Sequence, residues 1–189
     1  MFQVRIHGRG GQGVVTAAEL LSVAAFLDRR HAQAFPSFGS ERTGAPVVAF
    51  CRVDDRAIRS HEPIVEPDAV VVQDPTLLHQ VDVFGGLRSN GFVILNTART
   101  LGELGLAELD ERFPAGHVRT VAASELAREH LGRPMPGAPL LGALAAVTGV
   151  ASAESLAAAI RERFPGRLGE ANAAAATAAR LTMLDAVHA

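Results

Sequence analysis

The chain has 189 residues, of which 48% are hydrophobic, and its formal net charge is −2. This length and hydrophobic content predict one folded domain over residues 1–189 and exclude a largely disordered chain. The balanced charge excludes a general basic field for nucleic acid, and because every basic residue is an arginine, chemistry that requires a lysine is excluded too.

The N-terminal third alternates strand and helix patterns. Residues 2–6 alternate apolar and polar side chains, which predicts a first strand, and the apolar residues distributed around 13–28 predict a largely buried helix. A short second strand is predicted over 31–35, followed by a polar loop containing Pro and Gly over 36–44. The β-branched run 45–54 predicts a third strand.

Cys51, in the predicted third strand, is the single cysteine of the chain. It cannot form an internal disulfide, and one cysteine cannot hold an iron–sulfur cluster or a structural zinc ion. A buried structural thiol is therefore favoured over a reactive one.

The remaining strands are predicted in the middle of the chain. Residues 68–74 are apolar with an acid at each end, which is typical of a central strand buried on both faces, and 91–96 repeat that pattern. A sixth strand is predicted over 117–123.

The other segments are predicted to be helical. A helix is predicted over 100–109, where Thr100 and Glu103 have the spacing of a capping box. Four further helices are predicted over 124–132, 139–149, 152–164 and 170–188.

Strands alternating with helices predict an α/β fold, Rossmann-like, with a mostly parallel sheet flanked by helices and a helical C-terminal part. Ligands in such folds bind outside the carboxyl ends of the strands. The loops 7–13, 36–44 and 96–102 are therefore predicted to share one edge of the sheet.

The loop 7–13 (HGRGGQG) contains the spacing G-x-G-x-x-G from Gly8. Between a strand and a helix, backbone N–H groups and the helix dipole favour an anion, although a tight turn with glycines for packing alone is an alternative. A dinucleotide site requires an acid at the end of the second strand, and Asp28 has about the right spacing but precedes that strand. A P-loop is excluded because no GK[ST] follows.

The second loop adds charged and hydroxyl side chains to the same edge. Arg42 has the geometry to bind a phosphate or carboxylate with two hydrogen bonds, and Glu41 either pairs with it or bonds an amine or hydroxyl. A surface loop with a weak Glu–Arg contact is the alternative. Asn96, at the end of the predicted strand 91–96, is a weaker candidate. The seven histidines show no metal-ligand spacing. The residues of this chain therefore predict an anion-binding edge, and no complete set of catalytic groups is predicted.

The N-terminus has no secretory pattern, and no apolar run reaches the ~20 residues needed to span a bilayer. We therefore expect a cytoplasmic protein with neither a membrane nor a nucleic-acid partner.

The blocks GRGGQGVVTAAELL (8–21) and AQAFPSFGSERTGAPV (32–47) resemble the gamma subunit of 2-oxoacid:ferredoxin (acceptor) oxidoreductases, of which the pyruvate enzyme is the best known. The likeness continues in order through 51–78. It implies a Rossmann-like gamma module that works with alpha, beta and ferredoxin-like delta subunits.

The resemblance implies a complex that uses thiamine diphosphate, Mg²⁺ and [4Fe-4S] clusters to decarboxylate a 2-oxoacid oxidatively. Electrons pass to ferredoxin or another acceptor, and coenzyme A is the co-substrate that takes the acyl group. Pyruvate is the default substrate and an aryl-glyoxylate such as phenylglyoxylate is an alternative. The chain alone is expected to bind none of these cofactors and to contribute no catalytic residue.

The ligand-side positions carried over from the family are Gly10, Gly11, Gln12, Gly13, Ser37, Ser40, Glu41 and Arg42. They are expected to help bind coenzyme A and to close the active site. The alternative is an independent nucleotide-binding Rossmann-like reductase or binding protein, which would purify without cluster-bearing chains.

Overall fold

The computed structural model describes residues 1–37 and 43–188, and these contain one six-stranded sheet in the order β2-β3-β1-β4-β5-β6. The strands are β1 (Phe2–Arg9), β2 (His31–Pro36), β3 (Pro46–Asp54), β4 (Ala69–Val72), β5 (Phe92–Asn96) and β6 (Val118–Val121). Three of the five pairings among these strands are parallel: β1 with β4, β4 with β5, and β5 with β6. Strand β3 runs antiparallel to both β1 and β2.

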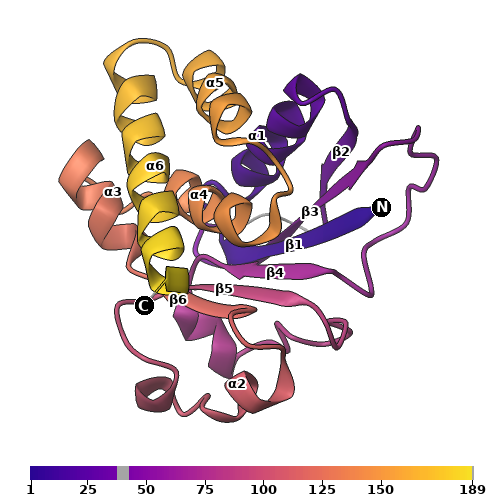
Figure 1. Cartoon of the computed structure of the whole chain (residues 1–189), viewed down its shortest axis with the longest axis vertical. Helices are drawn as coiled ribbons and strands as arrows, with labels where there is room; N and C mark the ends of the chain where they lie inside the picture. The colour runs from indigo at the N-terminus through magenta and orange to yellow at the C-terminus, as the bar shows by residue number, and fades with distance from the viewer. Residues whose placement is uncertain (38–42, 189) are drawn as a thin grey trace.

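Helices cover both faces of this sheet (Figure 1), which confirms the predicted α/β class and the helical C-terminal part. The helices are α1 (Val14–Leu27), α2 (Glu108–Arg112), α3 (Ala123–Leu131), α4 (Gly137–Thr148), α5 (Ala153–Arg163) and α6 (Arg167–His188), with short 3₁₀ turns η1 (Pro75–His79) and η2 (Gly102–Leu104). Helices α1, α4, α5 and α6 pack on one face, and α2 lies on the other. Among the described residues, no helix is long and apolar enough to cross a membrane.

The β2–β3 hairpin places the predicted loops at one edge. Arg9 pairs with Pro46 at the end of β1, and Pro36 pairs with Ala49 at the end of β2. Because β3 is antiparallel to both neighbours, its start lies beside the carboxyl ends of β1 and β2. The glycine loop, the described ends of the 36–44 loop and the segment after β5 therefore share the predicted edge.

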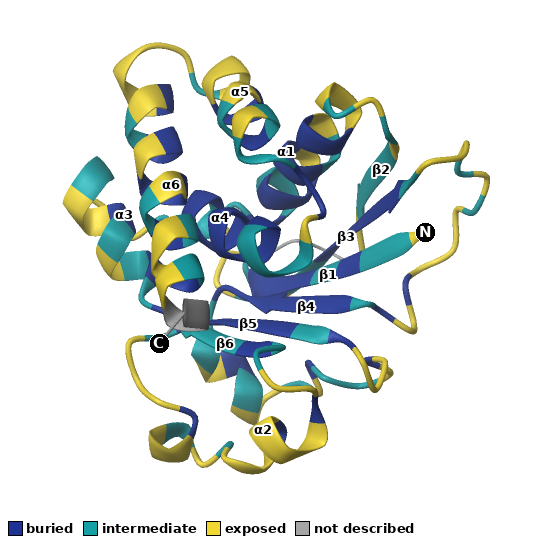
Figure 2. Ribbon diagram, viewed as in Figure 1, coloured by how far each residue is buried: buried dark blue, intermediate teal, exposed yellow. Residues whose placement is uncertain are grey.

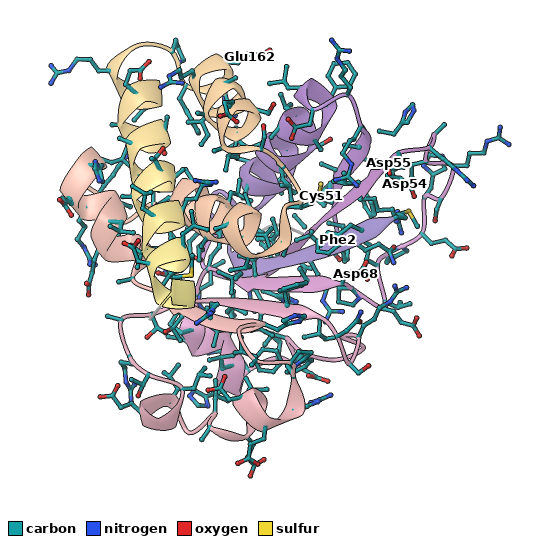
Figure 3. The ribbon with its side chains drawn as sticks, viewed as in Figure 1. Phe2, Cys51, Asp54, Asp55, Asp68 and Glu162 are labelled. Carbon is teal, nitrogen blue, oxygen red and sulfur yellow. The ribbon has the colours of Figure 1, made fainter. Side chains whose placement is uncertain are left out.

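The central strands are buried on both faces, as predicted (Figure 2). Ala69 and Val71 contact the hydrophobic cluster under α1 and α4, while Val70 and Val72 contact the cluster on the opposite face. Cys51 lies fully buried in β3 (Figure 3), and burial raises the pKa of its thiol to about 12, as expected of a structural thiol.

The structure moves several predicted boundaries by one to three residues, and it changes two predictions next to the shared edge. Strand β1 continues to Arg9, into the segment predicted as loop, because its pairing with β3 extends that far. The helix predicted over 100–109 is divided into η2 and α2, since Gly105 ends η2 at φ 71°. The capping box is present: the Thr100 N–H donates to Glu103 Oε2 at 2.8 Å, and the Glu103 N–H donates to Thr100 Oγ1 at 3.3 Å.

Candidate functional site

Glycine is needed at separate positions of the 7–13 loop for different structural reasons. A Cβ on Gly8 would lie 2.6 Å from Cγ2 of Val14, so Gly8 permits close packing of strand and helix. Gly11 and Gly13 have φ of 90° and 74°, in the left-handed region that favours glycine. A Cβ on Gly11 would meet no heavy atom within 4 Å, so at this position the backbone conformation, not the available space, selects glycine.

The loop presents unpaired backbone donors at the start of α1. The N–H of Gly10 donates to the Ala45 carbonyl at 2.9 Å and that of Gln12 to the Arg9 carbonyl at 3.0 Å. The N–H groups of Gly11, Gly13 and Val14 have no acceptor within residues 1–37 and 43–188. Gly13 caps α1 without a side-chain hydrogen bond, and the first turn of α1 contains no acid. The described part of this edge therefore offers amide donors and a positive helix end to an anion.

Gln12 holds the loop in shape. Its Oε1 accepts the Arg9 N–H at 2.8 Å, and its Nε2 donates to Asp74 Oδ2 at 2.9 Å. Both ends of the Gln12 amide are therefore used within the protein, and the groups left to face a ligand are the glycine amides around it.

Arg9 connects three segments of the edge. Its guanidinium pairs with Asp74 at 3.1 Å, and it also donates to the Gly44 carbonyl at 3.0 Å and to Thr76 Oγ1 at 2.7 Å. Burial disfavours the charged form of Asp74, but hydrogen bonds from Thr76 and Gln12 and the charge of Arg9 outweigh it and lower the pKa of this carboxyl. Sequence reasoning missed Arg9 and Asp74, although Asp74 follows a buried central strand, where ligand loops begin.

The ends of the 36–44 loop lie against the glycine loop. The Gly44 N–H donates to the Gly10 carbonyl at 3.1 Å, and Gly10 forms a parallel bridge with Thr43. Ser37 is exposed, and its N–H donates to the Val48 carbonyl at 2.8 Å. The predicted site residues Ser40, Glu41 and Arg42 lie outside the described residues.

Asn96 has a structural role at this edge. Its Nδ2 donates to the Gln73 carbonyl at 2.7 Å, and its Oδ1 accepts the Ser124 N–H at 3.0 Å. The amide of Asn96 thus joins the end of β4 to the first turn of α3. The neighbouring Gln73 side chain is 2% exposed and has no hydrogen-bond partner among the described residues, a feature that no local pattern signals.

Asp28 does not occupy the place of a ribose-binding acid. Its carboxylate accepts hydrogen bonds from the Ser152 N–H at 2.6 Å and from the Ser155 hydroxyl at 2.6 Å, at the start of α5. The carboxylate is therefore committed to a helix end, which removes the acid that the dinucleotide interpretation requires.

The described residues contain no group of three or more His, Cys, Asp or Glu side chains placed to hold a metal ion. What the described part of this edge offers is a set of backbone amides at a helix start, and such amides are donors suited to an anionic group.

The chain matches the family model "Pyruvate ferredoxin/flavodoxin oxidoreductase" over residues 3–182. It is 48% identical over 176 residues to the pyruvate synthase subunit PorC of Methanothermobacter marburgensis, covering 93% of this chain and 94% of the relative. It is 51% identical, with the same coverage, to the common subunit gamma of the pyruvate/ketoisovalerate oxidoreductases of Thermococcus litoralis.

Solved structures show the same fold. The crystal structure of the pyruvate oxidoreductase subunit PORC from Thermotoga maritima has 34% sequence identity, a TM-score of 0.79 and 95% coverage of both chains. The 2-oxoglutarate:ferredoxin oxidoreductase of Magnetococcus marinus has a TM-score of 0.74 at 14% identity, and there the fold corresponds to 31% of a longer chain. The resemblance to gamma subunits predicted from the residues is confirmed, and this chain belongs to the pyruvate ferredoxin/flavodoxin oxidoreductase family.

Proposed function

We propose that this chain is the gamma subunit of a cytoplasmic, thiamine-diphosphate-dependent iron–sulfur 2-oxoacid oxidoreductase, and that it helps to bind coenzyme A and to close the active site. The names of the relatives support pyruvate as the 2-oxoacid. Phenylglyoxylate, which those names do not mention, is kept as the alternative substrate. The observation that carries the coenzyme A assignment is the glycine loop, where N–H groups without acceptors in the described part of the chain meet the uncapped start of α1. Such a loop fits the phosphates of coenzyme A.

The redox and decarboxylation chemistry belongs to other subunits in this proposal. Thiamine diphosphate with Mg²⁺ and the [4Fe-4S] clusters supply that chemistry when bound to the alpha, beta and ferredoxin-like delta chains, which pass electrons to ferredoxin or another acceptor. The donor set of this chain does not fit a cluster, because its single cysteine is buried and the raised pKa of that thiol disfavours the thiolate. Its own residues bind and orient rather than react.

Arg42 provides the sharpest test of this proposal. We expect Arg42→Ala to raise the coenzyme A concentration required by the assembled enzyme about tenfold or more, because a charge-assisted hydrogen bond contributes roughly 1.5–3 kcal/mol. Arg42→Lys would recover only part of this loss, since a point charge cannot reproduce two parallel hydrogen bonds. Steady-state kinetics of the whole complex, varying coenzyme A and the 2-oxoacid separately, measure both effects.

The 2-oxoacid dependence serves as the internal control, because it should change much less than the coenzyme A dependence. Unchanged coenzyme A kinetics together with a complex that dissociates on a sizing column would identify Arg42 as an interface residue and refute its assignment to the ligand.

A further inference from the structure

Helix α1 exposes large apolar side chains near its C-terminal end. Phe26 is 71% exposed, and Val23 and Leu27 beside it are also exposed, although the opposite side of α1 is buried in the core. These positions are spaced by three and four residues, so they form one continuous strip on the helix surface. We call Val23, Phe26 and Leu27 the α1 strip. Figure 2 shows exposed turns at this end of α1.

A hollow adjoins the α1 strip between α1 and α5. It has a volume of about 180 Å³ and is lined by Glu19, Leu20, Val23, Ala159, Glu162 and Arg163. Its apolar lining comes from Leu20, Val23 and Ala159. Glu19 on α1, together with Glu162 and Arg163 on α5, adds two carboxylates and one guanidinium, so the charged part of the lining is negative on balance. Figure 3 labels Glu162 on α5. Neither carboxylate forms an ion pair within the described part of the chain.

We propose that the α1 strip and this hollow are the surface on which another subunit of the oxidoreductase complex docks. This inference rests on the proposed function, in which the chain is one subunit of several. The docking segment would insert an apolar side chain over Phe26 and Val23 and place an Arg or Lys near Glu19 and Glu162. Two carboxylates against one guanidinium leave the apolar hollow with a net negative charge, which complements a segment that carries both an apolar side chain and a cation.

The position of the surface suits such a partner. Phe26 lies 13 residues along α1 from Gly13, which at 1.5 Å per residue is about 20 Å along the helix. A subunit bound at the α1 strip would leave the glycine loop open to its ligand. Assembly and coenzyme A binding would then depend on opposite ends of the same helix.

The test uses the tagged chain co-expressed with the other subunits of its complex. We expect Phe26→Asp to reduce the amount of iron-bearing chains that co-purify with the tagged chain at least tenfold. The molar ratio of iron to tagged protein measures this amount. Leu181→Asp is the matched control, because Leu181 is also exposed, at 52%, but lies on α6 away from the strip; it should retain the wild-type ratio. Thermal denaturation of each isolated variant establishes that it is folded.

A second pair of variants tests the charges independently of the aromatic ring. Glu162→Arg should weaken association about fivefold or more, whereas Glu129→Arg, at an exposed position on α3, should not. Wild-type iron ratios in both Phe26→Asp and Glu162→Arg would overturn the proposal. So would a dimer of the isolated chain that Phe26→Asp makes monomeric while the complex assembles normally, because the occupant would then be a second copy.

The two proposals fail in different ways. If complexes carrying Arg42→Ala show normal coenzyme A kinetics while Phe26→Asp prevents assembly, the coenzyme A assignment is wrong and the docking surface stands.

Discussion

His7 is a histidine that the fold keeps neutral. It is 5% exposed on β1, and neither ring nitrogen has a hydrogen-bond partner among the described residues. Burial and, to a smaller extent, the charge of Arg5 lower the pKa of His7 to about 4, although Asp82 acts in the opposite direction. Between pH 4 and 6.5 an unfolded chain would protonate this imidazole while the folded chain would not.

His7 therefore makes stability depend on pH. Because the folded pKa is depressed, its contribution is fully present above the unfolded value of about 6.5 and is lost as the pH falls towards 4, by about 3 kcal/mol in total. We expect His7→Leu to flatten the decline of the unfolding free energy over this window. Urea denaturation of wild type and variant at pH 7.5 and 4.5 measures it, and identical declines in the two proteins would contradict the assignment.

Gly13 is constrained by its backbone conformation. We expect Gly13→Ala to cost about 1–2 kcal/mol because of its positive φ, and Gly13→Val to cost more because its side chain is β-branched. Gly149→Ala is the control: Gly149 has φ 65° and open space around it, but it ends α4.

Both alanine variants should lose similar stability in thermal denaturation, while only Gly13→Ala should raise the coenzyme A requirement of the assembled enzyme. A normal coenzyme A requirement in Gly13→Ala would indicate that the glycines serve only the turn.

At the scale of elements, side chains at the ends of helices join segments that are distant in the chain. Asp28, just after α1, accepts hydrogen bonds from Ser152 and Ser155 at the start of α5. Helix α4 crosses α6 closely, since a Cβ on Gly142 would lie 2.0 Å from the Ala176 carbonyl oxygen. These two contacts supplement the hydrophobic cluster that packs α1, α4, α5 and α6 on this face of the sheet.

Asp28→Ala should destabilise the protein by about 1–2 kcal/mol, in the range of a lost helix cap. Burial disfavours the charged form of Asp28, but the hydrogen bonds from Ser155 and Ser152 and the charge of Arg30 outweigh it and lower its pKa. The loss should therefore be present at neutral pH and shrink as the pH falls through that lowered pKa.

Asp55→Ala is the matched control for the Asp28 prediction, because the Asp55 side chain is 84% exposed and its pair with Arg30 should contribute about 0–1 kcal/mol. Equal losses in the two variants, measured by chemical denaturation, would rule out the capping role.

At the scale of the whole molecule, the chain is suited to recognition within a larger enzyme. Its single thiol is buried in β3, and its amide-rich edge and its exposed apolar strip lie at opposite ends of α1. We expect the isolated chain to be colourless and to turn over no pyruvate with coenzyme A. Visible absorption spectroscopy and an acceptor-reduction assay measure this, and a brown or active isolated chain would refute the subunit assignment.

The sequence alone determined most of the elements, because the alternation of strands and the apolar content of helices are local patterns. It also located the glycine loop and the edge that three loops share. The prediction of one helix over 100–109 was wrong because a single left-handed glycine, Gly105, ends the helical turn that the capping box begins.

Only the tertiary structure decided which distant groups meet. Strand β2 pairs with β3 as a hairpin rather than with β1, and that order brings Gly44 to Arg9 and Gly10. The pair of Arg9 with Asp74 spans 65 residues, and the hydrogen bond from Ser152 to Asp28 spans 124. No local periodicity encodes such contacts, because they depend on the order of strands in the sheet and on how the helices pack across it.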